Sequence, residues 1–159
     1  MTTQDLSFIC FSTAHWDAEL WTNRQRIMNI LSDDYKVLFV DPGLHSKKYT
    51  KKILTEHPKR FLPTHWLRQE KEKLWIYSPQ ILPLYRLTPL MQKLAWRVVA
   101  AQVRSFCRQF DFDKPVLWFY SPEALEVLGK LDESLVVYDC VDNYVATPYY
   151  ARSVGRVRR

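Results

Sequence analysis

The chain has 159 residues, of which 47% are hydrophobic, 14% aromatic and 25% charged, and its formal net charge is +6. This length fits one domain with a sizeable core, and the composition excludes the disordered and fibrous classes. No stretch reaches the roughly 20 apolar residues of a membrane-spanning helix, and the N-terminus lacks the pattern of a secretory signal.

Short apolar runs alternate with helical patterns along the chain. We expect strands over residues 6–11, 36–40, 74–77, 116–119 and 135–138. The first helix is expected from an N-cap at Asp17 through the helically spaced residues Leu20 to Leu31. Two further helices are expected over residues 88–110, where Thr88 precedes a proline, and 121–131. Residues 41–72 are expected to be irregular, apart from a short helix near 49–54.

Strands separated by helices pair in parallel through right-handed crossovers. The predicted fold class is therefore α/β, with a doubly wound, Rossmann-like, mostly parallel sheet of about five strands. It occupies residues 1–144, and an irregular basic tail follows at 145–159. Ligands of such sheets bind at the carboxyl ends of the strands, so a site is expected among residues 12–17, 41–42, 78–79, 120–121 and 139–144.

The loop after the first strand carries Trp16, Asp17 and Trp21, and the residues that follow include Arg24 and Gln25. It lacks the glycines of a dinucleotide-binding loop, so no cofactor is predicted. Aromatic rings pack on apolar sugar faces while polar side chains bind hydroxyls, so the loop predicts a sugar or phosphosugar site. The alternative is that both tryptophans lie in the core or an interface and the two polar residues lie on a solvated helix face.

Polar side chains also follow the last two expected strands. Tyr120 and Ser121 come after one strand, and Asp139, Asp142 and Asn143 come after the other. Acidic side chains at the carboxyl end of a strand face the ligand crevice, so these residues are candidates for substrate binding. The alternative is that the aspartates and the asparagine cap the following turn.

The long helix is expected to carry one basic stripe. Lys93, Arg97, Arg104 and Arg108 fall within about 60° of arc at 100° per residue. With the apolar residues 81–87 and a basic segment at 44–73, this stripe indicates contact with an anionic membrane. The alternative is the charged outer face of an ordinary surface helix. Nucleic acid is a disfavoured partner because no nucleic-acid motif accompanies the charge.

The cysteines and histidines predict no metal centre. Cys10, Cys107 and Cys140 are odd in number and widely spaced, a pattern that indicates neither a disulfide framework nor a CxxC metal pair and fits the reducing cytosol best. Cys10 and Cys140, in or beside strands, are expected to be buried. The four histidines share no ligand spacing, so no metal site is predicted.

Three stretches resemble the N-terminal domain of bacterial GT-B glycosyltransferases of the family-four type. They read ICFSTAHWDAELWTNRQRIMNILSDDYKVLFVDPG, VLWFYSPEALEVLGKL and VVYDCVDNY, and the resemblance covers about residues 6–144 with a weak match in the middle. It implies retaining transfer of a sugar from a nucleotide-sugar to an acceptor in cell-wall or exopolysaccharide synthesis. It also implies that Trp16, Asp17, Arg24 and Gln25 line the acceptor side of the cleft, with Asp142 near the reacting hydroxyl as the catalytic candidate.

The sequence departs from that family in lacking a second Rossmann-like half and a glycine-rich first loop. We interpret the arginine-rich tail, 145–159, as a truncation point or a shifted reading frame. The expected function is thus a glycosyltransferase-like domain that binds a sugar or lipid-linked acceptor, with little or no transfer activity alone. The alternative is a stand-alone binding module that docks on an anionic membrane or on a separate donor-domain chain. The expected location is cytoplasmic, peripheral at the inner face of the membrane.

Overall fold

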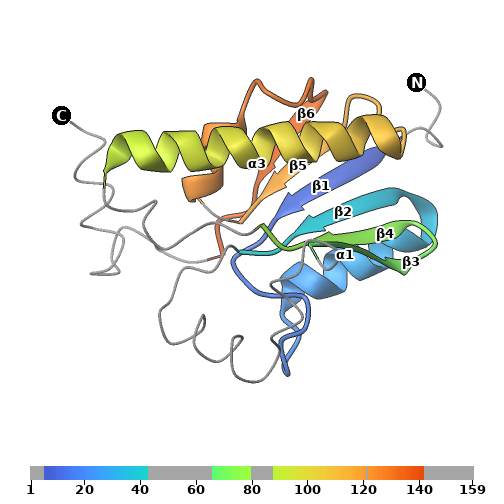
Figure 1. The fold of residues 1–159 in the computed structure, drawn as a ribbon. Helices are drawn as coiled ribbons and strands as arrows, with labels where there is room; N and C mark the ends of the chain where they lie inside the picture. Colours follow the sequence, from blue (N-terminus) through green and yellow to red (C-terminus); the bar gives the residue numbers. More distant parts are fainter. Residues whose placement is uncertain (1–5, 43–65, 80–87, 121, 142–159) are drawn as a thin grey trace.

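The computed structural model describes residues 6–42, 66–79, 88–120 and 122–141, and within them the chain forms one six-stranded sheet (Figure 1). The strands lie in the order β3-β4-β2-β1-β5-β6, and every neighbouring pair is parallel except the antiparallel pair β3 and β4. This is the α/β, mostly parallel architecture that the sequence predicts. The strands are Ser7–Phe11 (β1), Lys36–Val40 (β2), Leu67–Lys71 (β3), Leu74–Tyr77 (β4), Val116–Phe119 (β5) and Leu135–Tyr138 (β6).

The central strand β1 is buried on both faces, as its continuous apolar sequence predicts. Because side chains alternate along a strand, β1 contributes to two separate cores. Ile9 and Phe11 pack in the core beneath helix α3, and Phe8 and Cys10 pack in the core beneath helix α1. Figure 1 shows the two helices on opposite faces of the sheet. The arrangement is doubly wound.

Helix α3, Pro89–Gln109, begins where the sequence predicts. The Oγ1 of Thr88 accepts the N–H of Met91 at 3.1 Å, and Pro89 occupies the first helical position. At the other end of the helix, the Lys36 ammonium donates to the carbonyl of Phe110 at 2.8 Å and to that of Asp111 at 3.1 Å. A residue from the start of β2 therefore holds the C-terminus of α3 at the amino edge of the sheet.

Helix α1, Asn23–Asp34, begins later than the sequence predicts, because its N-cap is Thr22 and not Asp17. The Oε1 of Gln25 accepts the N–H of Thr22 at 3.0 Å, which is one half of a capping box. Leu20, expected on the buried face of the helix, lies before it and is 84% exposed. The physical reason is Trp16, whose indole is buried in the core. The residues between Trp16 and the helix therefore form a loop and not a helical turn.

Two other elements differ from the expectation. Strand β3 lies in a region expected to be irregular, and its sequence, LRQEK, shows no apolar alternation because it is a partly exposed edge strand. The helix expected over 121–131 is a short 3-10 helix, Pro122–Val127 (η5), whose Ala124 and Val127 are buried. Buried residues that are three positions apart, as Ala124 and Val127 are, fit both an α-helix and a 3-10 helix, so the sequence pattern does not distinguish the two. The helix expected near 49–54 lies outside the described residues.

The opposite edge strand, β6, is apolar and exposed. Leu135 is 57% exposed, and Val136 and Tyr138 are each 42% exposed. The three cysteines form no disulfide in the part of the chain that the structure describes; Cys10 and Cys107 are buried, but Cys140 is exposed, so its expected burial is wrong. Cys140 follows this exposed edge strand, whereas Cys10 lies in the central strand β1, which is buried on both faces. Within the described ranges, no helix is long and apolar enough to span a bilayer.

We predict that Met28→Ala, in α1, lowers the free energy of unfolding by about 2 to 5 kcal/mol, because Met28 is fully buried and truncation leaves a cavity. The matched control is Ile30→Ala in the same helix, where the side chain is 65% exposed and the expected change is within about 0.5 kcal/mol. Urea unfolding of the two variants measures both values. Equal losses would show that α1 does not cover the sheet as described.

Candidate functional site

The loops that leave β1, β2 and β4 meet at one buried carboxylate, that of Asp41. Asp41 follows β2 and is 3% exposed. Its Oδ1 accepts the backbone N–H of Trp16 at 2.8 Å, and its Oδ2 accepts the hydroxyl of Ser78 at 2.7 Å. The Nδ1 of His15 lies 3.7 Å from the same Oδ2. A buried carboxylate needs such partners, and here they fix the geometry of the carboxyl edge of the sheet.

Two of the predicted binding residues support this loop from inside. Gln25 is fully buried, and its Nε2 donates to the carbonyl of His15 at 2.9 Å. Trp16 is 2% exposed, with its ring 5.0 Å from that of Phe39 and 4.7 Å from that of Trp21 between centroids. In this conformation Trp16 lies in the core, which is the alternative to a sugar-binding role given above. Gln25 does not reach the surface. Trp21 is 38% exposed, so one indole of the pair reaches solvent.

Asp17 faces β3 and forms a two-point ion pair with Arg68. The two guanidinium nitrogens lie 2.6 Å and 3.1 Å from its carboxylate oxygens. Arg68 also binds Glu70, with Nε 3.2 Å from Oε2. Arg68 was not predicted as a site residue, because it lies in β3, a strand that the sequence pattern does not indicate. Asp17 therefore joins the first loop to the edge of the sheet, and its carboxylate is already engaged by a cation.

Arg24, Tyr120 and Asp139 come together at the carboxyl ends of β1, β5 and β6. The Arg24 Cζ lies 5.4 Å from the centroid of the Tyr120 ring, a cation–π distance. Tyr120 is fully buried; burial, Cys10, and the charge and hydrogen bond of Asp139 raise the pKa of its hydroxyl above the ordinary value. Asp139 is half-buried directly after β6. Three predicted binding residues, Arg24, Tyr120 and Asp139, thus come from separate segments of the chain and form one polar cluster.

The remaining predicted residues either lie on α3, away from the carboxyl edge, or are outside the described residues. Ser121, Asp142 and Asn143 are outside the described residues. The four basic residues of the predicted stripe are exposed on α3, which covers a face of the sheet and is not part of its carboxyl edge. They are Lys93, Arg97, Arg104 and Arg108.

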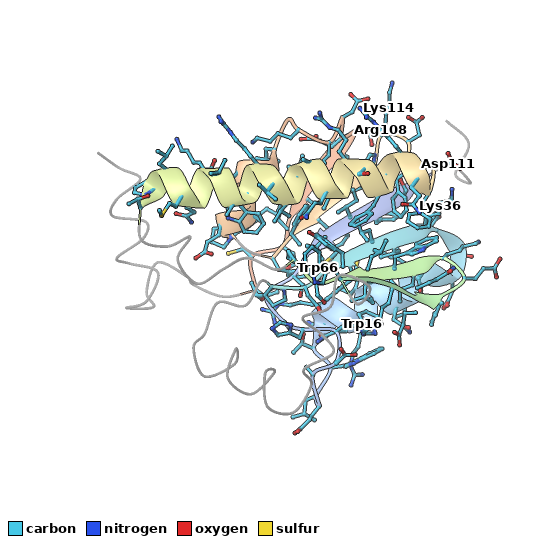
Figure 2. The ribbon with its side chains drawn as sticks, in the orientation of Figure 1. Trp16, Lys36, Trp66, Arg108, Asp111 and Lys114 are labelled. Carbon is cyan, nitrogen blue, oxygen red and sulfur yellow. The ribbon has the colours of Figure 1, made fainter. Side chains whose placement is uncertain are left out.

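A cavity of about 510 Å³ lies at the opposite, amino edge of the sheet. It is lined by Lys36 and Asp111, which Figure 2 shows near the C-terminal end of α3, and by Lys73, whose ammonium donates to the carbonyl of Asp34 at 3.0 Å. These lysines bind the carbonyls at the ends of α3 and α1, which accounts for their position there. Since parallel sheets bind ligands at the carboxyl edge, we take the Asp41 and Arg24 region as the candidate site.

Asp41 and Ser78 were expected near the site only by their place after strands, whereas His15 was one of the hydrogen-bonding side chains of the loop expected to form the sugar site. Their common feature in the sequence is a polar side chain within a few residues of the end of an apolar strand. In the part of the chain that the structure describes, no group of three or more histidine, cysteine, aspartate or glutamate side chains could hold a metal ion. Comparison of the chain with protein-family models, with curated proteins and with solved structures gave no match.

We predict that Asp41→Ala lowers the free energy of unfolding by about 1 to 3 kcal/mol, because it leaves the buried N–H of Trp16 without its acceptor. Asp33→Ala is the control: its carboxylate is exposed and pairs with Lys71 at the surface, so less than about 1 kcal/mol is expected. Urea unfolding compares the two. A loss at Asp41 no larger than at Asp33 would mean that the carboxylate does not organise the loops.

We predict that stability falls as the pH rises from about 9 to about 11. Burial raises the pKa of the Cys107 thiol from 9.0 to about 11, and the pKa values of Cys10, Tyr77 and Tyr120 are raised in the same direction by burial. In this window the unfolded chain releases protons that the folded chain keeps, so the free energy of unfolding decreases. Urea unfolding across this range measures the slope, and Cys107→Ala should reduce it. Constant or rising stability would contradict the burial of these groups.

Proposed function

We propose that the chain is the acceptor-side domain of a glycosyltransferase-like protein, and that it binds the sugar or lipid-linked acceptor of a transfer reaction in cell-wall or exopolysaccharide synthesis. One observation supports this most: Arg24, Tyr120 and Asp139 converge at the carboxyl edge of the sheet. This is the edge at which open α/β sheets bind their ligands.

The side chains at this edge have the chemistry that a polyhydroxylated ligand requires. The Arg24 guanidinium is a hydrogen-bond donor, the Asp139 carboxylate is an acceptor, and the His15 imidazole can act as either. The exposed part of the Trp21 indole offers an apolar ring to a sugar face. The Asp41 network holds the loop that carries His15, so the ligand would meet a rigid surface.

Sugar transfer joins an acceptor oxygen to the anomeric carbon of the donor while the bond to the nucleoside diphosphate breaks. Both reactants must therefore be positioned together. The sequence supplies no glycine-rich loop for the diphosphate. We accordingly propose that the chain has little or no transfer activity alone and that a separate donor-domain chain is its partner. Asp142 remains our proposal for the residue near the reacting hydroxyl.

We also propose a cytoplasmic location in which the domain is peripheral at the inner face of the membrane. The exposed basic residues of α3 support this location, because cations near the surface of an anionic leaflet are attracted to it. Membrane contact and acceptor binding use different surfaces, so either can be tested without the other.

We predict that the purified chain binds members of a panel of sugar phosphates and oligosaccharides, and that Arg24→Gln weakens this binding about tenfold or more, as loss of a charged hydrogen-bond donor does. Arg26→Gln is the matched control, since Arg26 is an exposed arginine on the same helix. Isothermal titration calorimetry gives both dissociation constants. Equal affinity of the two variants, or no binding to any saccharide, would contradict the proposal.

A second assay addresses the missing transfer activity. The purified chain is incubated with a panel of nucleotide-sugars, and release of the nucleoside diphosphate is followed. We expect no release above that of the buffer. Measurable turnover would show that the chain holds the donor as well as the acceptor, which the proposal denies.

A further inference from the structure

Helix α3 has a second apolar row on the side away from the sheet. Leu90, Leu94 and Val98 follow one another at four-residue intervals and are 76%, 59% and 51% exposed. Met91 lies beside them and is 45% exposed. Single exposed apolar residues are common on protein surfaces, but several large ones in a continuous row mark an interaction surface.

The apolar row is not part of the core-facing side of the helix. At 100° per residue, its centre lies about 160° from the centre of the buried residues of α3. Those buried residues are Trp96, Val99, Ala100, Val103 and Cys107. The row therefore points away from the sheet and is open along the first three turns of the helix.

A basic row runs beside the apolar row. Lys93, Arg97, Arg104 and Arg108 are all exposed, and their centre lies about 70° from that of the apolar row. Figure 2 labels Arg108 near the C-terminal end of the helix. The sequence of α3, PLMQKLAWRVVAAQVRSFCRQ, has no acidic residue, so all of its charged side chains are cationic.

This combination fits an anionic lipid bilayer better than a protein or a nucleic acid. Protein hot spots are enriched in aromatic residues, and binders of single-stranded nucleic acid stack aromatic rings on bases. The exposed apolar residues of α3 are aliphatic or methionine, which suit acyl chains. An interfacial helix that places aliphatic residues below the headgroups and lysine or arginine at their level shows this pattern. The absence of acidic residues gives charge complementarity to anionic headgroups along the whole helix.

We propose that α3 docks the domain on an anionic bilayer through its N-terminal turns, with Leu90, Leu94 and Val98 inserted among the acyl chains and the basic row in contact with the lipid phosphates. This inference rests on the proposed peripheral location and deepens it by naming the surface that inserts. It is independent of acceptor binding, since it uses none of the residues of the carboxyl-edge cluster.

The direction of α3 determines which edge of the sheet would face the bilayer. The bond between Lys36 and the Phe110 carbonyl places the C-terminus of α3 at the amino edge of the sheet, so its N-terminal turns lie toward the carboxyl edge (Figure 1). These turns carry the apolar row. Docking through them brings the carboxyl edge of the sheet close to the lipid surface, which, if the proposed acceptor function holds, is where a lipid-linked acceptor would be met.

Co-sedimentation with vesicles tests the docking. We use vesicles of phosphatidylcholine with about one third phosphatidylglycerol, vesicles of phosphatidylcholine alone, and the full chain. The apolar variant is L90Q/L94Q/V98Q and the basic variant is K93Q/R97Q. The matched controls are Ile30→Gln and Arg26→Gln on α1, where an exposed apolar and an exposed basic residue lie on the opposite face of the sheet.

We expect the wild-type chain to bind the anionic vesicles and to bind more weakly as salt is added. Each α3 variant should lower the partition coefficient about tenfold or more, while both α1 controls keep the wild-type value. Urea unfolding confirms that every variant is folded. Saccharide binding by the apolar variant in the absence of vesicles should stay at the wild-type value, which separates this proposal from the acceptor proposal.

Three outcomes would overturn the docking. The first is a wild-type chain that does not sediment with anionic vesicles. The second is an apolar variant that binds as wild type while the basic variant does not, which would mean surface attraction without insertion. The third is equal binding by all variants, which would place the contact on another part of the chain.

Discussion

The carboxylate of Asp41 is the interaction on which the candidate site depends. Parallel pairing of β1, β2 and β4 brings the loops after these strands to one edge of the sheet, but pairing alone does not give the loops a shape. Asp41 does so by accepting the N–H of Trp16 and the hydroxyl of Ser78. The bond to Trp16 holds its indole in the core.

The position of Trp16 in turn determines where α1 begins and what its first turn presents. With the loop closed over the indole, the helix begins at Asn23, and the side chain of Gln25 turns inward to the carbonyl of His15. Arg24, its neighbour, is directed to Tyr120 at the end of β5. The polar cluster at the carboxyl edge is thus assembled from one helix residue, Arg24, and from two residues that directly follow strands, Tyr120 and Asp139. The buried carboxylate sets the arrangement of the first loop.

Sequence reasoning recovers the parts of this fold that depend on local patterns. The continuous apolar run of β1 predicts a strand buried on both faces, and Thr88 with Pro89 predicts the start of α3. Prediction from sequence fails where a contact between residues that are far apart in the sequence determines the local structure. Asp17 has the right residue type for an N-cap, but the contact between Asp41 and Trp16 keeps it in a loop, where it pairs with Arg68. That arginine lies in a charged edge strand with no apolar pattern to reveal it.

The same distinction applies to the site. The sequence identifies Arg24, Tyr120 and Asp139 individually, because polar residues after strands face the ligand edge, but only the fold shows that they form one cluster. It does not separate Gln25, which is buried, from Arg24, which reaches the surface, because both follow the first strand at similar distance. The sequence does not predict the exposed apolar row of α3, because leucine and valine in a helix are normally assigned to its core-facing side.

The central claim is that ligands bind at the carboxyl edge of the sheet, and backbone NMR chemical-shift mapping tests it most directly. A saccharide that binds the isotope-labelled chain is titrated in, and the amide resonances are followed. We expect the largest shifts at His15, Arg24, Tyr120 and Asp139. Shifts centred instead on Ser7, Lys36 and Lys73, around the cavity at the amino edge, would contradict it.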